Sequence, residues 1–191
     1  RTELIRSKER IFKQGDPTKS IESITEYLYN EKNYEVSNVI TTDFNGERKE
    51  RYITYSCDYT TNPGLLGQLV QNNIVSAPVT TKSSVMKNYA PNSWNVYFLE
   101  EKVTEYALLS TGDIKPYRIL EQRFDTPMPV YNPGGPTFHP YFAPGDPSNP
   151  AYKEVQTFTY DGQGRLIGMK DEGDRRISNL YGYNDKYVTA T

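Results

Sequence analysis

Short runs of alternating side chains, separated by glycine and asparagine turns, most limit how this chain can fold. The run RYITYSCDY (51–59) places Ile53, Tyr55 and Cys57 on one side and more polar residues on the other. Neighbouring side chains of a strand point to opposite faces, so this pattern predicts a half-buried strand. Further strands are predicted in the runs SITEYLYN, YEVSNVITT, WNVYFLEEKVTEYALL, PYRILEQRF, YKEVQTFTY and RRISNLYGYN.

Turn-forming residues lie between these runs. The segments QGDPTK, DFNGE, STGD and DEGD supply Gly, Asn or Asp, which tolerate the positive backbone angles of tight turns. The Asn45–Gly46 pair is the clearest hairpin signal. The sequence therefore predicts an all-β chain built on a twisted antiparallel sheet of about seven to nine strands. An open or curled sheet is expected, with a sandwich or a partly open barrel as alternatives.

One segment predicts a helix, NPGLLGQLVQNN. Asn62 is placed to cap it, Pro63 suits the first helical position, and apolar residues repeat at a spacing of four. Its two glycines and short length limit it to a turn or two packed against the sheet.

Composition excludes several classes of function. A net charge of −2 gives no basic stripe for nucleic acid. One Cys and one His exclude an internal disulfide and the usual zinc sets, and Cys57 is expected to be a small buried hydrophobe. The chain has no apolar run of the ~20 residues that a membrane span needs. Its 17 tyrosines suit a half-exposed sheet surface. No cofactor or metal is predicted.

We predict a single β domain over 1–191, in four parts. They are a first hairpin region (1–60), a short helix with central strands (61–124), a proline- and aromatic-rich loop (125–151) and a second hairpin region (152–191). The chain starts without a signal-type segment and ends abruptly in KYVTAT, so we expect a piece of a longer protein. An export signal is then expected outside it.

The segment 125–151 holds eight of the 13 prolines and a cluster of rings. A loop this long inside a compact domain is usually functional or disordered. The candidate binding residues are Tyr131, Phe138, His139, Tyr141 and Phe142, whose rings suit either sugar stacking or packing against one another. A catalytic His139 would need a nucleophile, and the chain has no Gly-x-Ser-x-Gly elbow. No catalytic residue is predicted.

The acidic residues are expected to serve turns. Asp161 is expected to accept backbone hydrogen bonds within DGQG, the alternative being half of a catalytic carboxylate pair. The run of Asp171, Glu172 and Asp174 lacks the spacing of a calcium loop and predicts a solvated hairpin turn. Glu100 and its neighbour Glu101 lie in a predicted strand and face opposite ways, so they form no carboxylate pair.

Two segments of the chain repeat one another. The alignment matches Tyr29–Asn30 with Tyr160–Asp161, Val36 with Ile167, Gly46 with Gly173, and Tyr52/Tyr55 with Tyr181/Tyr183. Each unit has a Tyr-Asp or Tyr-Asn pair, a turn, a strand, a glycine turn, and a return strand that ends in aromatics. Such a hairpin buries one face, so units must lie side by side to form a stable sheet.

This unit resembles the YD repeat of Rhs and teneurin-type proteins. The matching residues are Tyr160, Asp161, Gly164, Arg165, Leu166, Gly173, Tyr181 and Tyr183. The stretch SCDYTTNPGLLGQLVQNNIVSAPVTTKS, with the ending LYGYNDKYVTA, is similar to the C-terminal side of the repeat region in Rhs-like surface proteins of Bacteroidetes-type bacteria. Two features depart from the family: Tyr29–Asn30 replaces Tyr-Asp, and the segment 125–151 has no place in the repeat.

The resemblance implies an antiparallel sheet that coils, in full-length members, into a hollow shell. It implies a non-catalytic structural module of a secreted or cell-surface protein, with a scaffold or encapsulation role. The expected partner is the remainder of its own longer chain. The alternative is a glycan- or protein-binding module that uses the segment 125–151.

Overall fold

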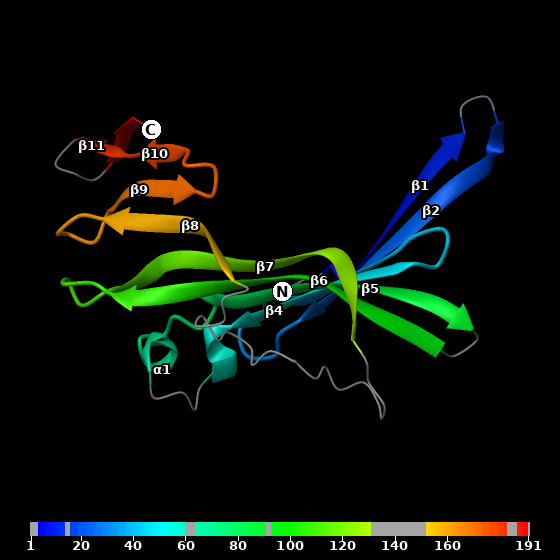
Figure 1. Ribbon diagram of the computed structural model, residues 1–191, viewed down its shortest axis with the longest axis horizontal. Helices are drawn as coiled ribbons and strands as arrows, with labels where there is room; N and C mark the ends of the chain where they lie inside the picture. The colour runs from blue at the N-terminus through cyan, green and yellow to red at the C-terminus, as the bar shows by residue number, and fades with distance from the viewer. Residues whose placement is uncertain are drawn as a thin grey trace. The chain divides into compact units, whose positions relative to one another are not determined.

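The computed structural model describes residues 4–13, 16–59, 64–90, 93–130, 152–182 and 187–190. Within them, strands β1 to β10 form one sheet in strict chain order, and β11 pairs with β12 (Figure 1). The strands are β1 (Arg6–Lys13), β2 (Asp16–Tyr29), β3 (Val36–Thr42), β4 (Arg48–Tyr55), β5 (Pro78–Ala90), β6 (Ser93–Leu108), β7 (Ile114–Val130), β8 (Lys153–Tyr160), β9 (Leu166–Asp171), β10 (Arg176–Ser178), β11 (Leu180–Gly182) and β12 (Tyr187–Ala190).

The pairings β1–β2, β2–β3, β3–β4, β7–β8, β8–β9 and β9–β10 are antiparallel. Among the described strands, β1 and β10 each have one hydrogen-bonded neighbour, so the sheet is open. The predicted all-β antiparallel sheet is confirmed in its open form, with ten strands in place of the expected seven to nine.

The chain divides into two compact units. The first takes the described residues of Arg1–Thr54, Thr80–Glu101 and Arg123–Pro144, and the second those of Tyr55–Val79, Lys102–Gln122 and Gly145–Thr191. Strands β4, β5, β6 and β7 contribute residues to both units.

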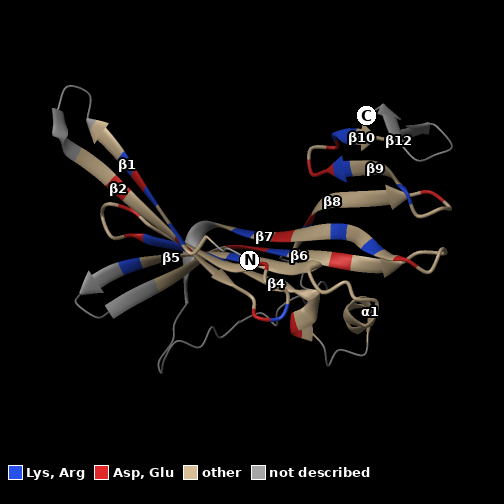
Figure 2. Ribbon diagram, turned by 180° about the vertical axis from the view of Figure 1, so that it is seen from behind, with Lys and Arg blue, Asp and Glu red and all other residues tan. Residues whose placement is uncertain are grey.

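The first unit is a meander in which polar contacts between strands set the register. The Thr25 and Thr41 hydroxyls lie 3.3 Å apart, and those of Thr54 and Thr80 lie 2.7 Å apart. Basic and acidic residues are spread along both β1 and β2 (Figure 2). Cross-strand pairs of this kind stabilise a sheet by up to about 1 kcal/mol each. The register therefore depends on many small polar pairs as well as on buried side chains such as Ile40.

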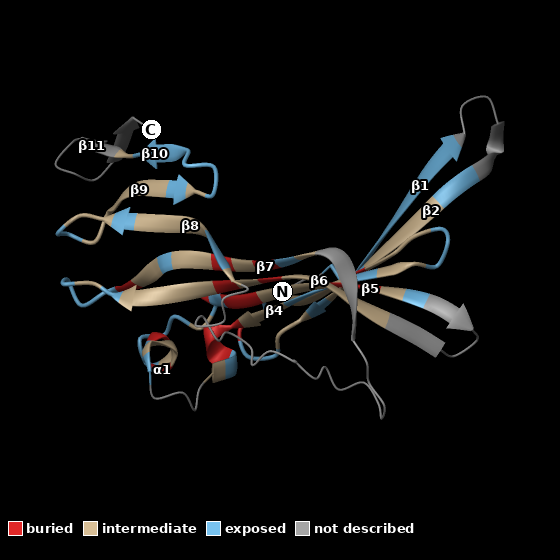
Figure 3. Ribbon diagram, in the orientation of Figure 1, coloured by how far each residue is buried: buried red, intermediate tan, exposed pale blue. Residues whose placement is uncertain are grey.

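The second unit has a small apolar core beside its helix α1 (Leu65–Gln71). Leu69 is 1% exposed and packs in one cluster with Ala77 and Ile114. Next to it lies the 3-10 helix η1 (Ser56–Tyr59), whose first two residues are buried (the red segment near α1 in Figure 3). Ser56 is fully buried and donates from Oγ to the Ile74 carbonyl at 2.5 Å, which satisfies its hydroxyl.

The helix is where it was predicted, but its start differs. The N-cap is Gly64, in extended conformation and without a side-chain capping bond, whereas Asn62 and Pro63 lie outside the described residues. The Gly64 carbonyl accepts the Gln68 N–H at 3.2 Å and so begins the helical bonding.

Other differences follow from burial and pairing. Cys57, expected in a strand, lies in η1 and is 3% exposed, so the expected burial is confirmed within a different element. Strands β1 and β5 were not predicted, because their charged and hydroxyl-rich sequences lack an apolar face of period two. Strand β7 continues through Val130, into the predicted loop 125–151. In the described pairing, β7 is hydrogen-bonded to β8 only from Arg118 to Glu121. The prolines of β7 beyond Glu121 therefore remove no hydrogen bond between these two strands.

Candidate functional site

A five-residue turn with aspartate in its first position joins β8 to β9. Asp161 Oδ1 accepts the backbone N–H groups of Gln163 and Arg165, both at 2.9 Å. The Asp161 N–H donates to the Arg165 carbonyl, and the Gly164 N–H to the Asp161 carbonyl, each at 3.0 Å. The expectation that the Asp161 carboxylate serves its own turn is confirmed.

The same bonds recur in the turns at 43–47 and 171–175. The Oδ1 atoms of Asp43 and Asp171 accept the N–H groups of the residues two and four positions later, at 2.9 Å in the first turn and 3.0 to 3.1 Å in the second. The turn at 109–113 makes the same backbone bonds around Leu109, at 2.8 and 3.0 Å. One turn geometry therefore closes four hairpins along the described chain.

The fourth residue of each turn has a positive φ. Gly46 has 77°, Gly112 has 86° and Gly164 has 75°, and in the fourth turn the residue is Asp174, at 60°. The predicted match of Gly46 with Gly173 is therefore wrong by one position. Asp is among the few non-glycine residues that enter this region readily, so Asp174 fills the place that glycine fills elsewhere.

The tyrosine before each Asp or Asn marks the same irregularity in the ladder. The register shifts between Leu28 and Tyr29, and Tyr29 pairs with Val36. The register of β8 with β9 shifts in the same way between Thr159 and Tyr160, and Tyr160 pairs with Leu166. The two units therefore correspond at their tyrosines, and Val36 corresponds to Leu166 rather than to Ile167. This shift was not visible in the sequence alignment.

Two half-buried tyrosines of the second unit donate hydrogen bonds from their hydroxyls to backbone carbonyls. Tyr160 Oη donates to the Pro116 carbonyl at 2.8 Å, and Tyr106 Oη donates to the Pro78 carbonyl at 2.8 Å. Burial raises the pKa of both phenols, that of Tyr106 to about 12 with a smaller contribution from Tyr160. A phenol protonated so far above neutral pH donates a hydrogen bond and offers no base. Both residues are therefore suited to holding strands together.

Arginines complete two of the aspartate turns. Arg165 Nε and Nη2 lie 2.6 and 2.5 Å from Asp161 Oδ2, and Arg175 Nε lies 2.6 Å from Asp171 Oδ2. The hydrogen bond from Arg165 holds the pKa of Asp161 below its usual range, with help from the turn amides. An ionised carboxylate with both oxygens occupied is a poor general acid or base. Sequence reasoning named Arg165 only as a match to the repeat; it missed Arg175 and the pairing of both arginines with the turn aspartates, although the recurrent Asp-x-x-x-Arg spacing was visible.

Two acidic residues of the turn at 171–175 pair with basic side chains, Asp171 with Arg175 and Asp174 with Lys170. The Lys170 ammonium lies 2.6 Å from Asp174 Oδ1 and lowers the pKa of Asp174. Glu172 is exposed. Within the described part of the chain, the side chains of His, Cys, Asp and Glu form no group of three able to hold a metal.

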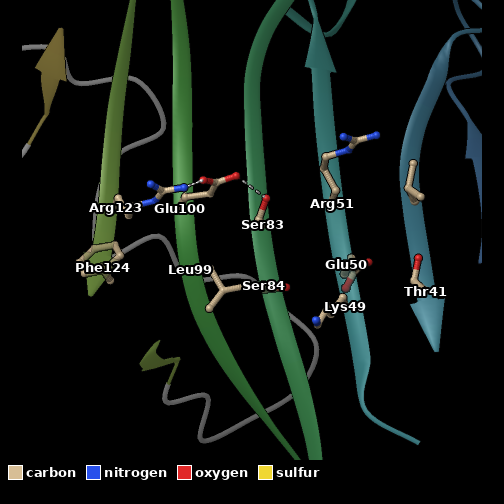
Figure 4. A pocket seen from close by; sticks show the side chains of 11 residues that line it. Thr41, Lys49, Glu50, Arg51, Ser83, Ser84, Leu99, Glu100, Arg123 and Phe124 are labelled. Atoms are coloured by element: carbon tan, nitrogen blue, oxygen red, sulfur yellow. Dashed lines mark hydrogen bonds and ion pairs between the residues drawn. The ribbon is translucent and has the colours of Figure 1, made fainter. Parts of the chain in front are cut away.

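A hollow of about 740 Å³ lies on the sheet of the first unit (Figure 4). Its lining residues come from β3 to β7 and are Val39, Thr41, Lys49, Glu50, Arg51, Ser83, Ser84, Leu99, Glu100, Arg123 and Phe124. Ser83 Oγ donates to Glu100 Oε1 at 3.1 Å, and Arg123 Nη2 lies 3.6 Å from Glu100 Oε2. Three strands bring these groups together, so no local sequence signal marked them.

The lining of the hollow mixes polar and charged side chains with the apolar Val39, Leu99 and Phe124. A serine nucleophile needs a base to take its proton, and the carboxylate that Ser83 contacts is also paired with Arg123. Glu101, the next residue, is 2% exposed and lies 3.3 Å from Lys82 Nζ. Glu100 and Glu101 thus have separate partners, as expected from their alternation along the strand.

The predicted binding residues Tyr131, Phe138, His139, Tyr141 and Phe142 lie outside the described residues. Of the predicted repeat residues, Tyr183 also lies outside them, and Tyr181 is described as part of β11 by its backbone. Glycan or protein binding by the segment 125–151 stays a prediction. A glycan array and a pull-down, each run with and without these residues, would test it.

In the described residues, no helix has the length and apolar character needed to cross a membrane. No family model, curated protein or solved structure matches this chain.

Proposed function

We propose that this chain is a non-catalytic structural module of a YD-repeat, Rhs-like protein, secreted or displayed at the cell surface, with a scaffold or encapsulation role. Its partner is the remainder of its own longer chain. The observation that carries the proposal is the recurrence, in chain order within one sheet, of a unit made of a tyrosine, a turn that begins with Asn or Asp, a strand and a second turn that begins with Asp.

Contact between neighbouring turns supports this role. A Cβ built on Gly164 would lie 3.0 Å from Asp113 Oδ2 and 3.2 Å from Thr111 Oγ1, so the turns at 109–113 and 161–165 touch. Hairpins packed this closely stabilise one another, as units of a repeat protein do. The acids and phenols described above are engaged in turns and strand contacts, which suits a framework.

The test adds repeat units to the chain. One and two further copies of residues 152–179 are inserted after Asn179, joined through Asn-Gly turns that favour a hairpin. In a repeat scaffold each copy covers the edge of the one before, so the denaturation midpoint rises with copy number and the β10 amides exchange more slowly. The control copies carry Asp161→Ala and Asp171→Ala, which remove the turn acceptors. Added copies that stay unfolded, or that leave the exchange of β10 unchanged, would contradict the proposal.

A further inference from the structure

The hollow on the first unit lies on a face of the sheet, away from the ends of the strand order (Figure 4). Its lining strands, β3 to β7, each have a hydrogen-bonded neighbour on both sides, so its position does not depend on where the sheet begins or ends. Its volume of about 740 Å³ is within the usual range for a small-molecule site. Such sites combine apolar surface with a few polar groups that fix the orientation of the ligand.

Strands β3 and β4 bring two cations to one face of the hollow. Their register pairs Val39 with Arg51 and Thr41 with Lys49. Directly paired residues, and residues two apart in a strand, have their side chains on the same face, so both cations lie on one face. Glu50, between them, points to the other face by the same alternation.

Strands β5 to β7 add a second group of charges to this lining. Figure 4 shows Ser83, Glu100 and Arg123 at one level across these strands, with Arg51 at about the same level on β4. Glu100 accepts the Ser83 hydroxyl and lies 3.6 Å from the Arg123 guanidinium. Because neighbouring strands are about 4.8 Å apart, the backbones of Arg51 and Arg123 are separated by about 14 Å, three strand spacings. In the described lining, the cations Lys49, Arg51 and Arg123 outnumber the carboxylate of Glu100, and this excess favours an anion.

Apolar surface borders these charges. Phe98 alternates with Glu100 along β6 and so lies on the same face. The Phe124 ring, which lines the hollow, meets the Phe98 ring edge-on, with 5.4 Å between the ring centres. Val39 borders the hollow on β3. The face therefore has guanidinium and ammonium groups for carboxylates, hydroxyl and carboxylate groups for hydroxyls, and apolar surface for C–H groups.

We propose that this hollow binds an acidic oligosaccharide, a short chain of sugars that carry carboxylates. Sugar acids have all three kinds of group that the face can contact: carboxylates, hydroxyls and C–H surface. An extended peptide fits less well, because peptides bind sheets through free main-chain groups at an edge and β3 to β7 are bonded to neighbours on both sides. A net charge of −2 on the whole chain disfavours nucleic acid. The inference goes beyond the proposed scaffold role and does not depend on it.

The test uses three probes and the full chain. The first is tetragalacturonate, and its methyl ester is the matched neutral ligand, because the ester keeps the rings and their hydroxyls and loses the charges. A capped tetraglutamate peptide supplies the same number of carboxylates without sugar rings. Each probe is titrated into the ¹⁵N-labelled chain at low salt, so that the amide chemical shifts report both affinity and place of binding. Tetragalacturonate is expected to bind roughly tenfold more tightly than the ester or the peptide, with its shifts in β3 to β7.

Two substitutions remove cations from opposite sides of the hollow. Arg51→Gln and Arg123→Gln are each expected to weaken tetragalacturonate binding roughly tenfold, as the loss of one charge-assisted hydrogen bond does. Both residues are exposed, so the fold should be kept, and circular dichroism checks this. The matched control is Arg176→Gln, at an exposed residue of β10 in the second unit, which should leave the affinity unchanged.

Absence of tetragalacturonate binding, or equal binding of the acid and its ester, would overturn the proposal. Tetraglutamate that binds as tightly as tetragalacturonate would overturn it as well, because the hollow would then recognise charge alone. Shifts confined to residues 125–151 would assign the sugar to that segment instead. An equal loss of affinity in Arg176→Gln and Arg51→Gln would show non-specific attraction and would also contradict the site. None of these results bears on whether added repeat units fold, so the scaffold proposal is tested separately.

Discussion

Replacing Gly164 by alanine tests whether neighbouring hairpins pack against one another through their turns. Gly164 and Gly46 occupy the same position of the same turn, with φ of 75° and 77°. A Cβ at Gly46 would meet nothing within 4 Å, whereas a Cβ at Gly164 would lie 3.0 Å from Asp113 Oδ2. The two substitutions therefore share their backbone cost and differ in the contact with the next hairpin.

The magnitude follows from these two contributions. A residue with a Cβ pays about 1–2 kcal/mol in the left-handed region, and the lower entropy of the unfolded chain returns about 0.4–1 kcal/mol. We expect Gly46→Ala to lower the free energy of unfolding by about 1 kcal/mol. Gly164→Ala also displaces the Thr111–Asp113 pair, whose hydroxyl–carboxylate bond is 3.2 Å long. With about 1 kcal/mol for that bond, we expect a total of about 2 kcal/mol.

Urea denaturation followed by circular dichroism measures both variants, and amide exchange in β8 and β9 locates the effect of Gly164→Ala. The control is Gly162→Ala in the same turn, where φ is not positive and nothing lies within 4 Å of the new Cβ. Its free energy of unfolding should stay within about 0.5 kcal/mol of the unaltered chain. The reasoning is refuted if Gly164→Ala costs no more than Gly46→Ala, because the adjoining turn would then contribute nothing.

Three further substitutions address the core, the acid range and the alkaline range. The Leu69 side chain is 1% exposed and lies in the core beside α1. Leu69→Ala should therefore lower the free energy of unfolding by about 2–4 kcal/mol in urea denaturation. A change below about 1 kcal/mol would show that this core is not packed as described. Asp161→Asn should make the free energy of unfolding fall less steeply in acid. The lowered pKa of Asp161 contributes stability above the ordinary carboxyl pKa of about 4, and this contribution is lost as pH falls through the folded-state pKa. Acid titrations of the variant and the unaltered chain that superimpose would contradict the Arg165 contact. Tyr106→Phe should cost about 1 kcal/mol at neutral pH through loss of the bond to Pro78. Because the Tyr106 pKa is raised to about 12, its contribution is present below the ordinary tyrosine value and is lost as pH rises towards 12, so the Phe variant should lose less stability over that range in denaturation series at stepped pH.

What the sequence determined by itself was local. Turn geometry depends on a few neighbouring residues, so Asn45–Gly46 and the aspartate of DGQG predicted hairpins and a backbone-bonding role for Asp161, and the structure has both. Period-two patterning predicted strands wherever one face was more apolar than the other. The same local rule explains the error at Gly173, because glycine is the usual residue at positive φ and Asp174 can adopt that angle as well.

The tertiary structure decided everything that depends on the neighbour across the sheet. Strand β1 has no apolar face and becomes a strand through its pairing and ion pairs with β2. Ser83, Glu100 and Arg123 meet because three strands are adjacent, and the carbonyl of Pro116 becomes the acceptor for Tyr160 in the same way. Such contacts join residues far apart in the chain, and their energies arise only after the strands are in register. The side-chain pattern within one segment therefore does not indicate which strand will lie beside it.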